Sequence, residues 1–239
     1  MTIAVAMAFD SGLLLCADTQ HGLPARIPCP SSRIFEKSYN SHPSGARSVF
    51  LISEPVDAVA TARERCERAL DGLPPNDYTI DRMRCSVEGS LRGDAERYSH
   101  AQFESNPDAT LLAALYSPLD RQCALFRASG NALHEFAGYD CQGSAGYFAH
   151  CIIRDRYHAA RSMESLDLTT VFAIATETIE SVRDCLGGCG ESIEIMVMYA
   201  NGRASPVQRI RRDTGKQRTL ALLGSLAGAR RDLGKSQMW

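Results

Sequence analysis

The stretch Thr2-Ile-Ala-Val-Ala-Met-Ala-Phe-Asp-Ser-Gly-Leu-Leu-Leu-Cys-Ala-Asp18 decides the fold. Its first half alternates between bulky and small side chains, which is typical of a β-strand with one bulky and one small face. The bulky residues are Ile3, Val5 and Met7. Residues 10–12, Asp-Ser-Gly, predict a tight hairpin turn with a glycine available for positive φ, and residues 13–17 predict the returning strand. Asp18 therefore ends that strand close to the start of the first one.

Outward from this hairpin, strands and helices follow in blocks. Patterns of apolar residues predict strands starting at 34 and over 48–52, helices over 56–70 and 80–103, a strand meander over 110–116, 123–127 and 132–136, helices over 147–161 and 168–185, and a strand over 193–199. Each sheet must bury its second face under helices. The order therefore predicts an α+β fold of two antiparallel sheets with helices on the outside.

Composition sets the class of protein. The chain has 239 residues, 44% hydrophobic and 23% charged, and a formal net charge of -2. These values are ordinary for a soluble globular protein and argue against general affinity for nucleic acid or an anionic membrane. We find no signal peptide and no apolar run near the ~20 residues of a membrane span.

The C-terminal part differs from the rest. Residues 203–239 hold nine basic and two acidic residues. We predict one domain over residues 1–202 and a basic extension over 203–239, a strand and a helix packed on the domain or on a neighbouring subunit. Nucleic-acid binding by the extension is disfavoured because no aromatic residues interleave with the charges.

Cysteine and histidine usage predicts neither disulfides nor a metal. The 9 Cys are odd in number, irregularly spaced and placed partly in apolar runs. This pattern predicts reduced, buried thiols in a cytoplasmic protein. Cys185 and Cys189 lack the second pair that a structural zinc site needs. His150 and His158 also lack a partner at metal spacing, so we predict no metal and no cofactor.

One nucleophile arises from the start of the chain. A small residue after Met1 permits removal of the methionine, which would leave Thr2 with a free α-amine. Such a hydroxyl can attack a carbonyl with the α-amine as base, whose ordinary pKa is near ~8. The alternative is that Thr2 is simply a strand residue, since Thr is a common strand former.

Five segments, taken in order, resemble the β-type subunits of proteasomes and their bacterial relatives. They are Thr2–Val5 with Asp10–Gln20, Ser31–Phe35 (SSRIF), Phe50–Asp57 (FLISEPVD), Gln142–Ala149 (QGSAGYFA), and Arg183-Asp184 followed by Gly187 and 193–199. The resemblance covers residues 2–200. It implies the four-layer αββα fold of N-terminal-nucleophile (Ntn) hydrolases, a polypeptide substrate and a homo-oligomeric ring or spiral.

The resemblance also implies a role for individual residues. Thr2 becomes the nucleophile, Asp18 orients the basic group, and Ser144 and Asp184 support the terminal amine and hydroxyl. The oxyanion position falls on Ser53. A first substrate pocket, expected to prefer a medium-sized apolar residue, is lined by His21, Ser31, Phe35, Leu51 and Pro55.

The sequence departs from the family at its basic residue. Only Lys37, Lys216 and Lys235 are lysine among 26 basic residues, and the family's catalytic Lys falls on Arg33. Arginine keeps the positive charge but cannot release its proton near neutral pH. Lys37 is four residues after Arg33, which places it ~13 Å further along the strand. Gly187 stands where the family has a late Ser.

Three functions therefore stay open. The first is a threonine peptidase working through an acyl-enzyme on Thr2. The second is a weak or inactive ring subunit with a structural or gating role, indicated by Arg33 and Gly187. The third is an Ntn amidase acting on small amides. An ATPase or regulatory partner is not selected by any residue.

Overall fold

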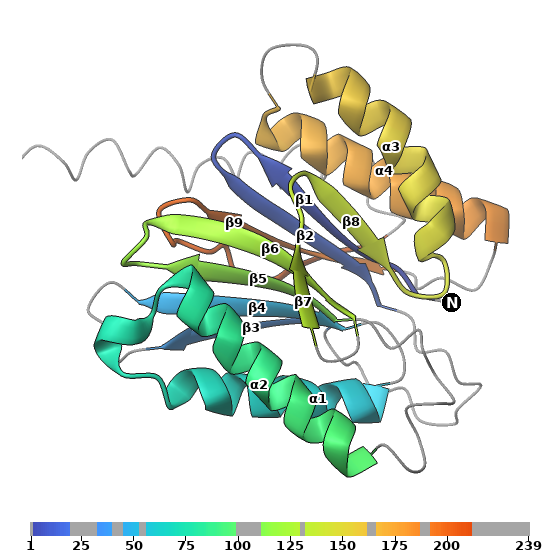
Figure 1. Cartoon of the computed structure of the whole chain (residues 1–239). Helices are drawn as coiled ribbons and strands as arrows, with labels where there is room; N and C mark the ends of the chain where they lie inside the picture. The colour runs from blue at the N-terminus through green and yellow to red at the C-terminus, as the bar shows by residue number, and fades with distance from the viewer. Residues whose placement is uncertain are drawn as a thin grey trace, which may run out of the picture.

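The chain folds as a stack of four layers, seen edge-on in Figure 1, in which two antiparallel sheets lie face to face between two pairs of helices. This is a computed structural model. It describes residues 2–19, 33–39, 45–52, 56–98, 111–129, 132–161, 166–186 and 192–211. The expected α+β sandwich is confirmed.

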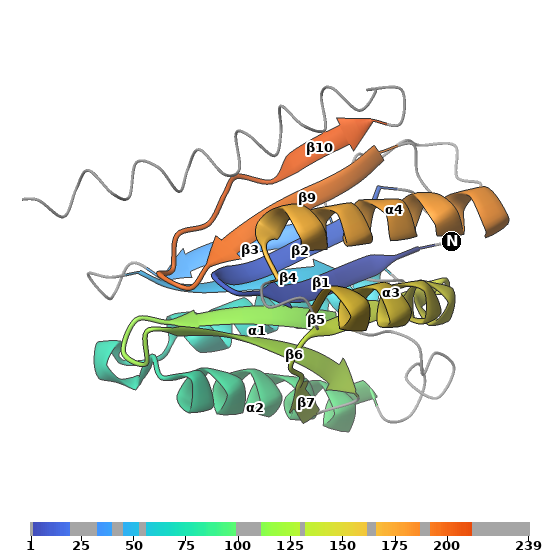
Figure 2. The ribbon, with the colours of Figure 1, turned by 90° about the horizontal axis from the view of Figure 1, so that it is seen from above.

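The first sheet contains both ends of the described chain. Its strands, in spatial order, are β10 (Gln208–Arg211), β9 (Ser192–Tyr199), β2 (Gly12–Asp18), β1 (Ala4–Phe9) and β8 (Tyr139–Gln142). The C-terminal strands thus extend the sheet that the N-terminal hairpin begins (Figure 2). Helices α3 (Gly146–Arg161) and α4 (Leu168–Leu186) cover its outer face.

The second sheet is built from the middle of the chain. Its strands, in spatial order, are β3 (Ile34–Tyr39), β4 (Ala46–Ile52), β5 (Leu111–Ser117), β6 (Gln122–Ser129) and β7 (Ala132–Glu135). Helices α1 (Val56–Asp71) and α2 (Ile80–Tyr98) cover this sheet, joined through a 3-10 turn at Pro75–Asp77.

The alternation in β1 sorts its side chains between two cores. Ile3, Val5 and Met7 join the apolar cluster beneath α3 and α4. Ala4 and Ala6 join the cluster between the sheets, where small side chains allow close packing. A third cluster lies between the second sheet and helices α1 and α2. The two-faced strand expected from the sequence is confirmed.

The predicted hairpin is confirmed, but Gly12 has a different role in it from the one expected. Phe9 pairs with Gly12, which leaves Asp10 and Ser11 as the loop. Gly12 is not among the described glycines with positive φ. A Cβ there would instead overlap the carbonyl oxygen of Met198 in β9. The glycine is needed because two backbones approach closely, and not for the positive φ that the sequence predicted.

One strand was missing from the prediction. β8 carries Asp140 and Gln142, which hid it in a polar stretch. The buried Asp140 carboxylate accepts hydrogen bonds from the Cys141 N–H (2.8 Å) and Gln142 Nε2 (3.1 Å), and it also lies 3.4 Å from Arg127 Nη1 of β6. The second helix ends at Tyr98 in the described ranges, and the rest of the predicted 80–103 span lies outside them.

The expectation of buried thiols holds only in part. The described cysteines are free, but Cys85, Cys151 and Cys185 are exposed. Burial raises the pKa of the Cys66 and Cys123 thiols to about 12.

Within the described ranges, no helix has both the length and the hydropathy that crossing a membrane requires.

Replacing Gly12 by Ala tests the close approach of β2 and β9. We expect Gly12→Ala to lower the free energy of unfolding by about 2 kcal/mol, because a backbone carbonyl cannot move aside as a flexible side chain can. The matched control is Gly89→Ala in α2, where a Cβ meets nothing within 4 Å. That variant should gain about 0.5–1 kcal/mol from helix propensity. Urea denaturation measures both, and equal stabilities would contradict the packing argument.

Thiol chemistry tests the burial of the cysteines. At pH 8 a small alkylating reagent should modify Cys85, Cys151 and Cys185 in the folded chain and Cys66 only after unfolding. Unfolded thiols ionise near ~8.5, well below the pKa of folded Cys66. Stability should therefore fall as pH rises from about 9 towards 12. Peptide mapping by mass spectrometry reads the first result, and modification of native Cys66 would contradict it.

Candidate functional site

The site forms where β1 begins, at the point marked N in Figure 1. The Thr2 N–H donates to Ser144 Oγ at 3.0 Å, and the Thr2 carbonyl accepts from the Ala145 N–H at 3.2 Å. Residues 143–145 form the turn between β8 and α3. Because β8 pairs with β1, this turn is brought to Thr2 from a distant part of the sequence.

Gly143 lets that turn approach Thr2. Its φ of +102° lies in the region that favours glycine. A Cβ at this position would overlap the Thr2 carbonyl oxygen and lie 3.1 Å from Thr2 Oγ1. The turn therefore packs directly on the backbone and the hydroxyl of Thr2.

Asp18 closes the end of the hairpin. Its Oδ1 accepts the Ile3 N–H at 3.0 Å, and its own N–H donates to the Ile3 carbonyl at 3.0 Å. The residue is fully buried. A buried carboxylate is costly unless it is hydrogen-bonded, so this arrangement anchors negative charge one residue from Thr2.

The Thr2 hydroxyl is unusual. Oγ1 is buried, and within the described ranges it has no hydrogen-bond partner. Buried hydroxyls in proteins nearly always have one. An oxygen left in this state at the start of a strand, beside an anchored carboxylate, is a candidate nucleophile.

Arg33 reaches the same end of the sandwich from the second sheet. It is buried just before β3. Its N–H donates to Glu194 Oε2 at 2.8 Å, and its carbonyl accepts the Ile52 N–H at 3.0 Å. The Arg33 backbone is thus tied to both sheets. Ser53, the predicted oxyanion position, follows Ile52 and lies outside the described residues.

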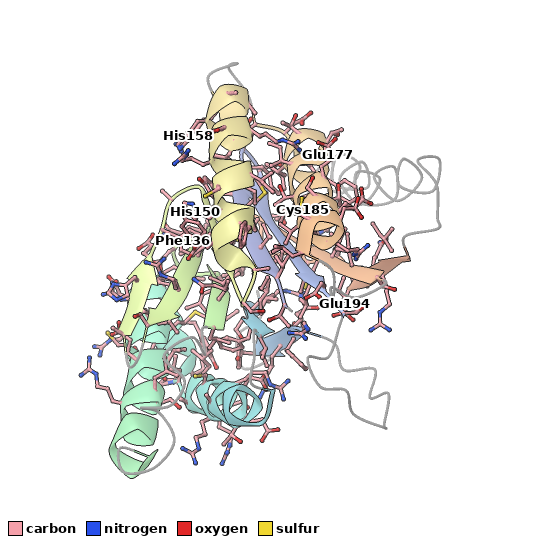
Figure 3. All side chains as sticks on the ribbon, turned by 90° about the vertical axis from the view of Figure 1, so that its right-hand side faces the viewer. Phe136, His150, His158, Glu177, Cys185 and Glu194 are labelled. Carbon is pink, nitrogen blue, oxygen red and sulfur yellow. The ribbon has the colours of Figure 1, made fainter. Side chains whose placement is uncertain are left out.

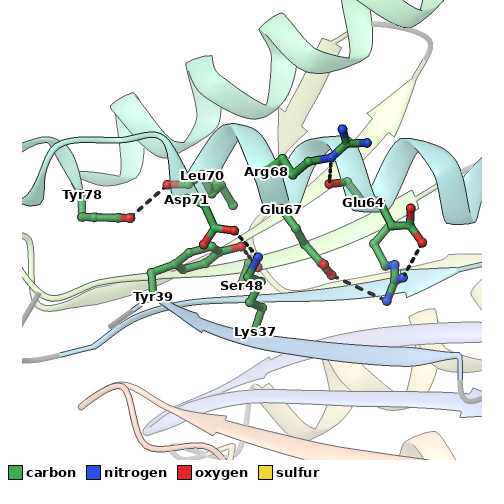
Figure 4. A network of polar contacts seen from close by, with 10 residues as sticks. Lys37, Tyr39, Ser48, Glu64, Glu67, Arg68, Leu70, Asp71 and Tyr78 are labelled. Carbon is green, nitrogen blue, oxygen red and sulfur yellow. Dashed lines mark hydrogen bonds and ion pairs between the residues drawn. The ribbon is translucent and has the colours of Figure 1, made fainter. Parts of the chain in front are cut away.

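Lys37 is engaged elsewhere. Its ammonium pairs with Asp71 at the end of α1 and lies 5.5 Å from the centre of the Tyr39 ring (Figure 4). The Tyr39 hydroxyl contacts Ser48 Oγ at 2.7 Å in the same network. Lys37 therefore faces α1 and is held away from Thr2, as its position along the strand predicted.

The remaining predicted site and pocket residues do not gather in one place within the described ranges. Ser144 and Asp184 are both exposed, and Asp184 lies in the last turn of α4. Leu51 belongs to the core between the sheets, whereas Phe35 packs on the helix side, with the Arg63 guanidinium 4.1 Å from its ring centre. The structure does not bring these two pocket residues to one face. His21, Ser31, Pro55 and Gly187 lie outside the described residues.

Glu194 and Arg209 were missed by the sequence analysis. Glu194 is a single charge inside the apolar run of β9, and that interruption was the available signal. Its carboxylate contacts the Arg33 N–H and, through Oε1, Arg209 Nη2 at 2.5 Å. Arg209 belongs to the basic extension, where its charge was counted without a partner.

A metal site finds no support. The described residues contain no group of three or more His, Cys, Asp or Glu placed to hold an ion. His150 and His158, labelled in Figure 3, instead pack against the Tyr139 ring, with centroids 5.0 and 6.3 Å away.

A cavity of about 490 Å³ opens at the far end of the hairpin, lined in part by Phe9, Leu13, Phe136 and Leu166. It lies at the opposite end of β1 from Thr2, so it is separate from the candidate site.

Comparison with solved structures supports the fold. The chain matches an Anbu (Gly-1) mutant from Hyphomicrobium sp. strain MC1 with a TM-score of 0.72 at 14% identity, covering 100% of this chain and 99% of the other. It matches Anbu, described as an ancestral beta-subunit, from Yersinia bercovieri with a TM-score of 0.71 at 14% identity, covering 99% and 98%. A helical assembly of the Anbu complex from Pseudomonas aeruginosa matches at 0.69 and 12%, covering 98% and 96%.

At these identities the likeness concerns the fold, and it agrees with the αββα sandwich of Ntn hydrolases. No known protein-family description and no curated protein sequence matches the chain.

Substitution of Gly143 tests the packing of the turn on Thr2. We expect Gly143→Ala to lower the free energy of unfolding by about 2–3 kcal/mol, from positive φ and from overlap with the Thr2 carbonyl. Ser144→Ala, the neighbouring control, removes only one hydrogen bond to an exposed side chain and should cost about 1 kcal/mol. Urea denaturation of both variants checks this. A Gly143→Ala chain as stable as Ser144→Ala would refute the close approach.

Proposed function

We propose that this chain is a proteasome-like subunit that cleaves amide bonds of polypeptides through Thr2 after removal of Met1. The observation that carries the proposal is the buried Thr2 Oγ1, which has no hydrogen-bond partner within the described ranges. The Thr2 nitrogen donates to Ser144 Oγ, and the neighbouring Ile3 N–H donates to Asp18. Arg33 is buried at the same end of the sandwich. The shared fold with Anbu, one form described as an ancestral beta-subunit, agrees with it.

Removal of Met1 frees the chemistry in two ways. It converts the Thr2 nitrogen from an amide into an amine, which can accept a proton near neutral pH. It also takes away the residue bonded to that nitrogen. Ser144 Oγ, 3.0 Å from the nitrogen, then holds the amine in place.

The proposed reaction uses the Thr2 hydroxyl and its α-amine. The α-amine takes the proton of Oγ1 as the oxygen forms a bond to the substrate carbonyl carbon. The C–N bond of the substrate breaks, and the departing amine receives that proton. Water then hydrolyses the ester on Thr2, with the α-amine again taking and returning the proton.

The charged residues have electrostatic roles in this scheme. Asp18 holds negative charge beside the site through its bond with the Ile3 N–H. The Arg33 guanidinium supplies positive field that stabilises the negative charge developing on the reacting oxygen atoms. It cannot carry a proton at neutral pH, so proton transfer falls to the α-amine.

The second candidate is a weak or inactive subunit of an assembly. Arg33 favours it because its guanidinium is larger than an ammonium group and the Arg33 backbone is tied to both sheets. A subunit of this kind would keep the fold and the assembly and lose turnover. Self-association into a ring or spiral belongs to both candidates.

Intact mass and a covalent probe distinguish the two. We expect the purified chain to lack Met1, and a β-lactone or epoxyketone probe to add once, at Thr2. Thr2→Ala is the control for site-specific addition. Retained Met1 would exclude the nucleophile. Absence of label on a chain without Met1 would favour the inactive subunit.

A variant at Arg33 measures the effect of the missing lysine. Arg33→Lys should raise the rate of fluorogenic peptide cleavage about tenfold, because an ammonium group is smaller and can exchange its proton. Lys37→Arg, which keeps its charge beside Asp71 away from the site, is the matched control and should leave the rate unchanged. A rate unaffected by Arg33→Lys would show that the guanidinium serves as well as an ammonium.

A further inference from the structure

Glu194 is a buried carboxylate at the site end of β9. Its side chain is 3% exposed. Along β9, Met196 and Met198 face the core between the sheets, whereas Ile193, Ile195 and Val197 face the helices. Glu194 shares the register of the two methionines, so it faces the second sheet and Arg33. Figure 3 looks onto this end of the molecule and labels Glu194.

Its two oxygens bind different elements. Oε2 accepts the Arg33 N–H at 2.8 Å, and Oε1 accepts from Arg209 Nη2 at 2.5 Å. Arg209 lies directly opposite Glu194 in the pairing of β10 with β9, and its side chain is 43% exposed. One carboxylate thus connects the C-terminal strand to the residue that stands in the lysine position.

Glu194 is too far from Thr2 to act on it directly. It pairs with Ala17, and Ala17 pairs with Ala4, two residues after Thr2. Two strand spacings across and two residues along place the Cα atoms of Glu194 and Thr2 roughly 12 Å apart. That is longer than a glutamate side chain. Glu194 therefore reaches the site only through the residues that it contacts, and Arg33 is one of them.

Buried charges of both signs lie at this end of the sheet. Asp18 and Glu194 are buried carboxylates, and Arg33 is a buried cation. Burial of an unpaired charge is costly. Arg209 supplies the second positive charge from the solvent side. Without it, Glu194 would keep its buried negative charge with one partner fewer.

We propose that Glu194, held by Arg209 of the C-terminal strand, is a positioning residue that fixes the Arg33 backbone at the site. The extension thereby becomes part of the site. The structural half of this inference is that Glu194 and Arg209 hold the Arg33 backbone, and it stands by itself. The catalytic half is that this positioning speeds the reaction of Thr2, and it rests on the proposed function.

Amide hydrogen exchange tests the structural half without any activity. In Arg209→Ala the Arg33 amide should exchange about tenfold faster. A hydrogen bond to a charged group contributes enough free energy to protect an amide by roughly this factor. Arg209→Lys should restore part of the protection. Arg203→Ala is the matched control, since Arg203 is an exposed arginine of the same extension. Unchanged exchange at Arg33, or equal acceleration in β5, would overturn the proposal.

The rate of covalent labelling at Thr2 tests the catalytic half of the inference. With a saturating β-lactone probe, Arg209→Ala and Glu194→Gln should slow labelling about tenfold, while the probe concentration for half-saturation stays the same. Arg203→Ala should label as the wild type does. Faster exchange at Arg33 with unchanged labelling would overturn the positioning role. If the wild type is not labelled at all, the proposed function fails, and the exchange experiment alone decides whether Glu194 and Arg209 hold Arg33.

Discussion

The pairing of β1 with β2 is the constraint on which the rest of this structure depends. Their register places the Ile3 N–H on Asp18 and the Asp18 N–H on the Ile3 carbonyl. A slip by one residue would turn Ile3, Val5 and Met7 into the space between the sheets and Thr2 towards the helices. Gly12 secures the register, since the hairpin can lie against β9 only where no Cβ intervenes.

The sequence predicted the fold well because its signals are local. Alternation in residues 2–8, the Asp-Ser-Gly loop and the strong periodicity of 168–185 each depend on neighbouring residues, and each agrees with the structure. β8 escaped because its strand character comes from pairing with β1, far away in the sequence. Cys151 was misjudged because its apolar neighbour Ile152 does not show which face of the helix Cys151 occupies, and Cys85 and Cys185 are likewise exposed on helices.

The site could be predicted only as far as single residues allow. Resemblance selected Thr2, Asp18, Arg33 and Ser144 as candidates. The structure ties Thr2 to Ser144 and its neighbour Ile3 to Asp18 by hydrogen bonds, whereas the Arg33 N–H is bonded to Glu194. Glu194 interrupts an apolar run, which is a local signal, but its partners Arg33 and Arg209 are set by pairing across the fold and cannot be read from neighbouring residues. Phe35 and Leu51 lie on opposite faces of the sheet because Phe35 pairs with Phe50, and Leu51 is the next residue along β4.

The order of strands in the first sheet has a consequence for when this site comes into being. β2 lies between β1 and β9, two strands that are far apart in the sequence. Contacts so distant in sequence form late in folding, since the entropy cost of closing a long loop comes before the contacts can stabilise the chain. Glu194 and Arg209 emerge from the ribosome after almost every other described residue. A nascent chain can therefore carry Thr2 without an organised site around it. The surroundings of Thr2 therefore need strands from both ends of the described chain before they are complete.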